Sequence, residues 1–206
     1  MIRIHDIQAL AEDLLGRPLT AQDGFRQKSI ASAEHALGRS LPAPLETFYR
    51  LIGKLPQFTN AHEHFYRPGK LRIVDGLLMF LDENQHVCSF GVDPQERVFR
   101  CHDNERYDEK VDLQAFLNLI LQYQVAQGSD YSFTVNLPED KLGVLLAQDE
   151  WQETVNHNQL LIHRLDGFLI WYFRDASGQV MDDMIFFSGL NDPPETLIER
   201  YCLEDL

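Results

Sequence analysis

The sequence predicts an α+β protein in which N-terminal helices pack on one side of a mostly antiparallel sheet. Two observations support this prediction. Apolar residues recur at helical spacing through the first quarter of the chain, and from Leu71 onward they gather in short runs that polar turns separate. With 44% hydrophobic residues among 206, the chain can fill a core and fold by itself.

Three helices are predicted before residue 54. Residues 54–70 are predicted to form a long loop, because they contain prolines and their apolar residues follow neither helical nor strand periodicity. Gly38 and Gly53 are expected in left-handed positions just after two of the helices. Pro42 and Pro44 suit a first helical turn, where a missing N–H donor is tolerated. The apolar stripes of the three helices are Ile4, Ile7, Leu10 and Leu14; Ile30, Ala33 and Leu37; and Leu45, Phe48, Tyr49 and Ile52.

An antiparallel meander is predicted next, with strands at 76–81, 86–90 and 97–101. The first two strands flank a polar hairpin turn, in which we expect Asn84 or a neighbour to take a turn conformation. The four residues of this turn are Asp82, Glu83, Asn84 and Gln85. Asp112 is then a predicted N-cap for a helix that runs to about Gly128 with one apolar stripe.

The last 80 or so residues are expected to add strands and a terminal helix to the same globular unit. Predicted strands lie at 131–135, 160–163, 168–173 and 180–188, with a hairpin turn over Asp175, Ala176, Ser177 and Gly178. The closing helix is expected to begin at Asp192, as an N-cap followed by proline. Asp75-Gly76 and Asp166-Gly167 precede similar apolar runs, which we interpret as two hairpins that use the same turn chemistry.

Composition excludes several classes of function. The chain has 18 basic and 32 acidic residues, a net charge of −14. This charge repels phosphate groups, so we expect neither nucleic acid nor a membrane surface as a partner. No signal-peptide pattern and no apolar run of membrane-spanning length are present, which predicts a cytoplasmic protein. Three cysteines without a Cys-x-x-Cys pair are expected to be reduced thiols.

The acidity is concentrated near the C-terminus. Residues 1–127 hold 14 basic and 17 acidic groups, whereas residues 128–206 hold 4 and 15, a net charge of −11. This asymmetry either keeps the chain soluble or faces a basic partner. Trp151 is either an exposed interface anchor among acids or a packed indole. The candidate partner-binding residues are Asp149, Glu150, Trp151, Glu153, Asp175, Asp182 and Asp183.

Two segments resemble a known family. Residues 30–49 contain a Glu, a Leu-Gly, a Leu-Pro and then an aromatic-rich helix, and residues 82–92 read Asp-Glu-Asn-Gln-His-Val-Cys-Ser-Phe-Gly-Val. Together they resemble the SUKH superfamily over residues 25–125, with Phe90 where one bacterial branch has Trp. The resemblance implies an α+β protein-binding domain without catalytic residues. Many bacterial members are immunity proteins against toxins, often nucleases, and fungal relatives regulate cell-wall synthesis.

The residues themselves offer little catalytic chemistry. No nucleophile elbow, phosphate-binding loop or zincin motif is present, so we expect neither an enzyme nor a cofactor. One cluster could suggest a metal, but its spacing fits neither a zinc finger nor a zincin, and we expect no bound metal. Its members are His62, Glu63, His64, His86, Cys88, Cys101 and His102. The aromatic run within 168–187 is expected to fill the core of the sheet.

The sequence thus favours a SUKH-like core over residues 1–127 and an acidic extension over residues 128–206. The expected function is that of a non-catalytic immunity protein, which neutralises a bacterial toxin by direct binding. The toxin is expected to be basic, for example a nuclease. The alternative is a housekeeping regulatory or scaffold protein of the same fold that has no toxin partner.

Overall fold

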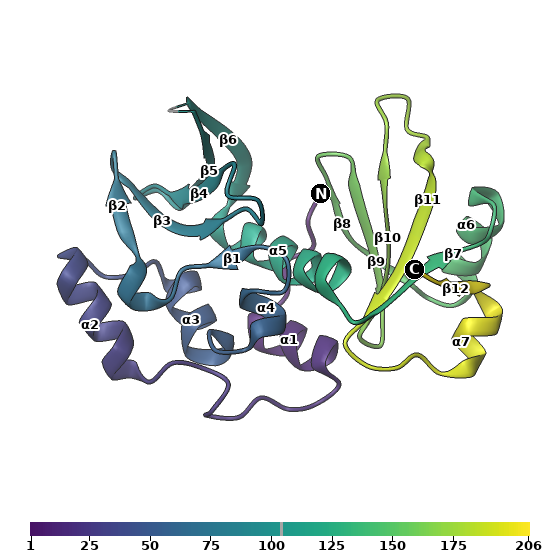
Figure 1. Ribbon diagram of the computed structural model, residues 1–206, viewed down its shortest axis with the longest axis horizontal. Coiled ribbons are helices and arrows are strands. Elements are labelled where there is room, and N and C mark those ends of the chain that lie inside the picture. The colour runs from purple at the N-terminus through teal and green to yellow at the C-terminus, as the bar shows by residue number, and fades with distance from the viewer. Residues whose placement is uncertain (104) are drawn as a thin grey trace.

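The computed structural model describes residues 1–103 and 105–206; the side chains of Asp182 and Asp183 lie outside the described part. The predicted α+β class is confirmed (Figure 1). The described strands form two six-stranded sheets in place of the single predicted sheet, and all of their pairs are antiparallel. A long central helix lies between the two sheets.

The three N-terminal helices are α1 (Ile7–Leu15), α2 (Gln27–Leu37) and α3 (Ala43–Ile52). Ile4, expected on the first stripe, precedes α1 and is exposed. Gly38 ends α2 in the left-handed conformation with φ of 68°, as predicted. The prediction for Gly53 was wrong, because its φ is −59°. A Cβ there would lie 2.7 Å from the Tyr49 carbonyl oxygen, so close packing explains this glycine.

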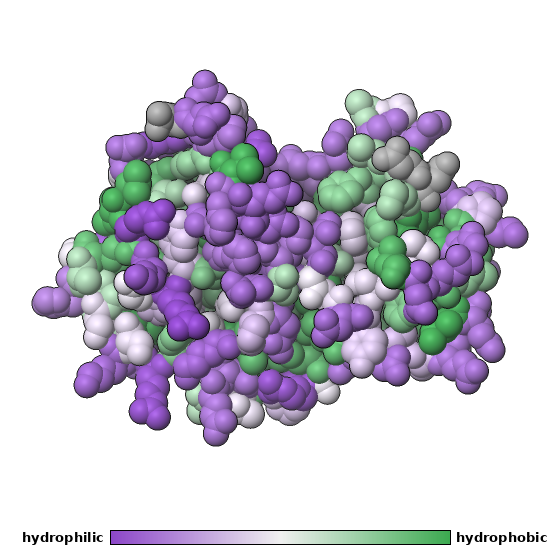
Figure 2. All heavy atoms as spheres, viewed as in Figure 1, coloured by the Kyte–Doolittle hydropathy of each residue, from purple (hydrophilic) through white to green (hydrophobic). Residues whose placement is uncertain are grey.

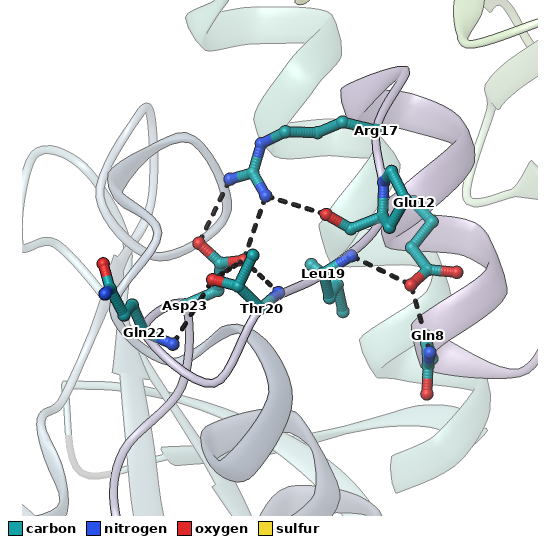
Figure 3. A network of polar contacts seen from close by, with 8 residues as sticks. Gln8, Glu12, Arg17, Leu19, Thr20, Gln22 and Asp23 are labelled. Atoms are coloured by element: carbon teal, nitrogen blue, oxygen red, sulfur yellow. Dashed lines mark hydrogen bonds and ion pairs between the residues drawn. The ribbon is translucent and has the colours of Figure 1, made fainter.

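Polar contacts fix the connection between α1 and α2 (Figure 3). The Arg17 guanidinium donates to both carboxylate oxygens of Asp23, at 3.0 and 3.1 Å, and the Thr20 N–H donates to Asp23 at 2.7 Å. The hydrogen bonds from Arg17 lower the pKa of Asp23 to about 2. On the α1 side, Glu12 accepts from the Leu19 N–H at 2.9 Å. This network explains how a connection with little apolar content remains ordered.

The long loop predicted over 54–70 is wrong in part. This segment holds α4 (Pro56–Thr59), β1 (His64–Phe65) and the 3₁₀ helix η1 (Pro68–Lys70). Both helical turns begin with proline, whose fixed φ suits a first turn. Phe58 is fully buried, and the rings of Phe65 and Phe48 stack with centroids 4.4 Å apart. Tertiary packing therefore supports elements too short to leave a period in the sequence.

The first sheet has the order β1-β3-β4-β5-β6, with β2 also paired to β3. Its other strands are β2 (Arg72–Val74), β3 (Leu77–Asp82), β4 (Ser89–Val92), β5 (Arg97–His102) and β6 (Glu105–Asp112). Of the predicted turn residues, Asp82 is the last residue of β3 and pairs with Ser89, while Glu83, Asn84 and Gln85 follow between β3 and β4. The connection is longer than predicted, and the left-handed residue is His86, with φ of 58°. The strand predicted at 86–90 therefore begins only at Ser89.

Helix α5 (Leu113–Gly128) begins at the predicted N-cap, where Asp112 accepts from the Ala115 N–H at 2.8 Å. It is buried around most of its circumference, including three polar side chains that tie other segments to it. Asn118 accepts from the His5 N–H at 2.7 Å, and Gln122 accepts from the Thr154 hydroxyl. Gln124 accepts from the Glu63 N–H at 2.9 Å and donates to the Glu63 carbonyl at 2.7 Å.

The second sheet has the order β12-β7-β11-β10-β9-β8. Its strands are β7 (Tyr131–Val135), β8 (Gln152–His157), β9 (Leu160–Leu165), β10 (Phe168–Arg174), β11 (Val180–Gly189) and β12 (Leu203–Asp205). Helices α6 (Glu139–Gln148) and α7 (Glu195–Arg200) cover one face. The predicted N-cap at Asp192 was wrong: Pro193 would begin that helix, but it precedes Pro194, and a residue before proline is disfavoured in the helical region. Helix α7 therefore starts after Pro194.

Both faces of the second sheet are buried, because successive side chains of a strand point to opposite faces. Leu169 and Trp171 of β10 join the core formed with α1, α3 and α5, whereas Ile170 and Tyr172 join the core under α6 and α7. Residues 128–206 therefore share a continuous apolar core with the N-terminal helices. The arrangement leaves the outer surfaces of α6 and α7 at one end of the molecule (Figure 1).

Candidate protein-binding surface

Two of the candidate partner-binding residues are held in packed contacts: Trp151 is buried and Asp149 is half-buried. Trp151 is 8% exposed, and its indole N–H donates to the Tyr201 hydroxyl at 2.8 Å. Asp149 accepts from the Arg200 guanidinium and from the Tyr201 hydroxyl, the latter at 2.6 Å. The hydrogen bonds from Arg200 hold the pKa of Asp149 below its usual range. Trp151 is therefore the packed indole of the two alternatives, and the expectation that it supplies surface contact was wrong.

The other candidates lie on separate elements. Glu150 is exposed between α6 and β8, in a left-handed conformation with φ of 61°. Glu153 is exposed on β8, where it accepts from Asn156 at 3.2 Å. Asp175 is exposed, but its carboxylate caps its own hairpin turn by accepting from the Ser177 and Gln179 N–H groups. The side chains of Asp182 and Asp183 lie outside the described part.

Seven exposed carboxylates lie on or next to α6, α7 and β12, and we call this set the acidic face. Arg200, at the end of α7, binds Asp149, just after α6, which holds the two helices together. Three of the four basic side chains in residues 128–206 already form ion pairs, namely Arg164, Arg174 and Arg200, while Lys141 is exposed. The acidic face consists of Glu139, which pairs with Arg174, and of Asp140, Glu150, Glu195, Glu199, Glu204 and Asp205.

Two apolar hollows lie beside the acidic face, where Asp140 and Glu139 take part in their lining. A hollow of about 280 Å³ is lined by Leu137, Val144 and Leu145 with Asp140 and Lys141 at its edge. A second hollow of about 300 Å³ shares Leu137 and extends to β11. Val144 is 55% exposed at this site. Figure 2 shows hydrophobic side chains among hydrophilic ones at this end of the molecule. An apolar centre bordered by polar residues is the usual composition of a protein-binding surface.

Sequence reasoning located this surface only in outline. The charge count of residues 128–206 includes every member of the acidic face, but it does not show which acids are exposed. Helix α6 was not predicted, so the apolar hollow beside it was not predicted either. Its only buried positions are Leu142 and Leu146, with Gly143 between them, which leaves a weak helical signal.

The residues of the 82–85 turn hold the β3–β4 connection in place. Asp82 accepts from the Ser89 hydroxyl at 2.6 Å, and Glu83 accepts from the Gln85 and Val87 N–H groups at 3.0 and 3.2 Å. The Asn84 amide lies 3.2 Å from a ring nitrogen of His62. Each contact is internal, so turn geometry accounts for these residues.

The histidine and cysteine cluster is only partly assembled. The rings of His64 and His86 stack with centroids 5.3 Å apart. Cys88 and Cys101 are half-buried, and burial raises the pKa of the Cys88 thiol to about 11. Within residues 1–103 and 105–206, no three His, Cys, Asp or Glu side chains are grouped so that they could hold a metal ion.

Comparisons with protein-family models, curated proteins and solved structures found no match for this chain. None of the helices in the described part is both long and apolar enough to cross a membrane. The candidate surface therefore rests on its own geometry.

Proposed function

We propose that this chain is a non-catalytic protein-binding module of the immunity type, which neutralises a bacterial toxin in the cytoplasm by direct binding. The observation that carries the proposal is the acidic face, whose carboxylates are exposed over α6, α7 and β12 while Arg174 and Arg200 are already paired. Its partner is a basic protein, such as a nuclease whose substrate groove must attract phosphate.

Charge and apolar area have different roles in this proposal. A negative surface steers a basic partner during diffusional encounter and disfavours neutral or acidic proteins. Affinity then comes from apolar contact at the centre of the interface, where Leu137 and Val144 border the hollow beside α6. An inhibitor that covers the basic groove of a nuclease excludes the nucleic acid without any chemistry of its own.

The resemblance of residues 25–125 to the SUKH superfamily supports the same proposal, because many bacterial members of that family are immunity proteins. The alternative is a regulatory or scaffold protein of the same fold. The two differ in gene context: an immunity protein is encoded beside its toxin, whereas a housekeeping protein has no such neighbour.

The experiment is co-expression of the chain with the product of the adjacent gene, with cell survival as the readout. We expect the wild-type chain to protect and the Asp140→Lys/Glu199→Lys variant to protect poorly. Neither carboxylate takes part in an ion pair or a side-chain hydrogen bond within the described residues, so the fold should tolerate the change. The control Glu46→Lys/Glu105→Lys adds the same charge to the N-terminal half and should protect fully. A neighbouring product that is harmless, or that kills despite the wild-type chain, would contradict the immunity function.

A further inference from the structure

A cleft of about 210 Å³ lies over α5, between the two sheets. Figure 1 shows the elements that frame it, with β4 and β6 on one side and β10 and the β8–β9 turn on the other. Four aromatic side chains line it, together with aliphatic ones: Phe90 of β4, Phe116 and Tyr123 of α5, and Phe173 of β10. Two carboxyl groups, Glu63 and Glu109, also belong to the lining.

Within the described residues, Glu63 is a buried carboxyl group without a cationic partner. Its side chain is 7% exposed, and Oε2 has no hydrogen-bond partner within the described residues. Oε1 lies 3.8 Å from Nε2 of His62, but burial lowers the pKa of His62, so that imidazole is neutral at pH 7. The Gln124 side chain hydrogen-bonds to both the N–H and the carbonyl of Glu63, which fixes the residue at the wall of the cleft. Leaving such a group unpaired is costly.

The other titratable groups around Glu63 do not supply a positive charge. Glu109 is bound by Arg100 Nε at 3.4 Å and by the Asn158 amide at 3.3 Å, so the Arg100 guanidinium is already paired. Glu83, in the β3–β4 connection, adds negative potential at Glu63. Burial raises the pKa of Tyr123 to about 12 and lowers that of His157, so both are neutral at pH 7. The cleft therefore combines apolar walls with a carboxyl group that has no cationic partner among the described residues; because burial raises the pKa of Glu63 to about 7, this group is about half ionised at pH 7, and a bound cation would favour the charged form.

We propose that this cleft binds an ammonium or guanidinium group carried on a short apolar stem. The cation would pair with Oε2 of Glu63. The rings of Phe90, Phe116 and Tyr123 would pack against the apolar stem and form cation–π contacts with the charged group. An anion is repelled from this site, and a neutral ligand leaves Glu63 unpaired. The ligand is either a free organic amine or a lysine or arginine side chain of a protein. The inference does not depend on the acidic face or on the proposed immunity function.

The test is an NMR titration at pH 7 with 2-phenylethylammonium, and with 2-phenylethanol as a neutral analogue of similar shape. We expect the amine to shift the resonances of Phe90, Tyr123 and Phe173, and the alcohol to bind at least about tenfold more weakly. Glu63→Gln should weaken amine binding by a similar factor, whereas Glu195→Gln, an equal charge change on α7, should not. Equal binding of amine and alcohol, or unchanged binding by the Glu63→Gln variant, would overturn the proposal.

Two further measurements use the wild-type chain alone. The first distinguishes a free amine from a protein side chain as the ligand, and the second tests the site without the Glu63→Gln variant. A capped Gly-Lys-Gly peptide that binds at least about tenfold more tightly than the free amine assigns the site to a protein side chain, and the reverse order assigns it to a free amine. The carboxyl ¹³C shift of Glu63 in the wild-type chain reports its pKa directly. Saturation with the amine should lower that pKa, because an adjacent cation favours the carboxylate. A pKa unmoved by either cation at tens of millimolar would refute the site.

Discussion

Replacement of Phe48 by alanine tests how the two parts of the core depend on each other. Phe48 is fully buried on α3, stacked on Phe65 at 4.4 Å between centroids and edge-on to Tyr49 at 5.5 Å. Emptying a buried phenylalanine site costs about 3–5 kcal/mol. We expect Phe48→Ala to lower the free energy of unfolding by about 4 kcal/mol, and the melting temperature by about 8–16 °C for a chain of this size.

The assay uses the position of the two tryptophans. Trp151 precedes β8 and Trp171 lies in β10, so fluorescence reports on the second sheet, remote in sequence from Phe48. Phe48 and Trp171 belong to the same buried cluster, so urea unfolding followed by fluorescence and by circular dichroism should show one midpoint, lowered equally in both. The control Val144→Ala, at a side chain 55% exposed, should change stability by less than about 0.5 kcal/mol. A fluorescence midpoint that does not move with Phe48→Ala would show that the sheets unfold independently.

Three further predictions concern single groups. Asp112→Ala should cost about 1 kcal/mol in urea unfolding, because α5 loses its N-cap, and Asp112→Asn should restore most of it. Trp151→Phe should cost about 1–3 kcal/mol by calorimetry, since it leaves Tyr201 without its donor, and a wild-type melting curve would contradict this role. Burial raises the pKa of Glu63 from 4.5 to about 7, so the folded chain keeps a proton that the unfolded chain releases. Unfolding free energy should therefore fall by about 2–3 kcal/mol as pH rises from 4.5 to 7, and Glu63→Gln should remove that slope; an unchanged slope would refute it.

The elements that the sequence predicted well are those in which local and tertiary signals agree. The stripe Leu45, Phe48, Tyr49 and Ile52 became the buried face of α3. The paired turns are another case: Asp75 and Gly76 have φ of 49° and 85°, and Asp166 and Gly167 have 46° and 83°. Two hairpins thus use the same left-handed pair, as their sequences indicated.

The strands that the sequence did not predict are defined by tertiary contacts and not by apolar periodicity. Strand β6 consists mostly of charged residues and is largely exposed at the edge of its sheet, so it shows no apolar alternation. Strands β8 and β12 were missed as well, and each lies at an edge of the second sheet. An edge strand is defined by hydrogen bonds to one neighbour, and sequence periodicity does not report those bonds.

The sequence predicted only the acidic character of the candidate site, and the positions of its residues became clear only from the fold. The acids flanking Trp151 suggested an exposed hot spot, yet Asp149 and Trp151 form a packed contact with Tyr201, 50 residues or more away in the chain. The cleft at Glu63 had no sequence signal, because β4, α5 and β10 meet only in three dimensions.

The most direct test of the proposed function is the association rate of the purified chain with the toxin domain encoded by the neighbouring gene, measured across ionic strength. Asp149 is kept intact, since it binds Arg200. We expect wild-type association to slow steeply with added salt, and Asp140→Lys/Glu199→Lys to associate about tenfold more slowly at low salt and to converge with wild type at high salt. The Glu46→Lys/Glu105→Lys control should follow the wild type. Association that is independent of salt and equal in all three proteins would contradict recognition through the acidic face.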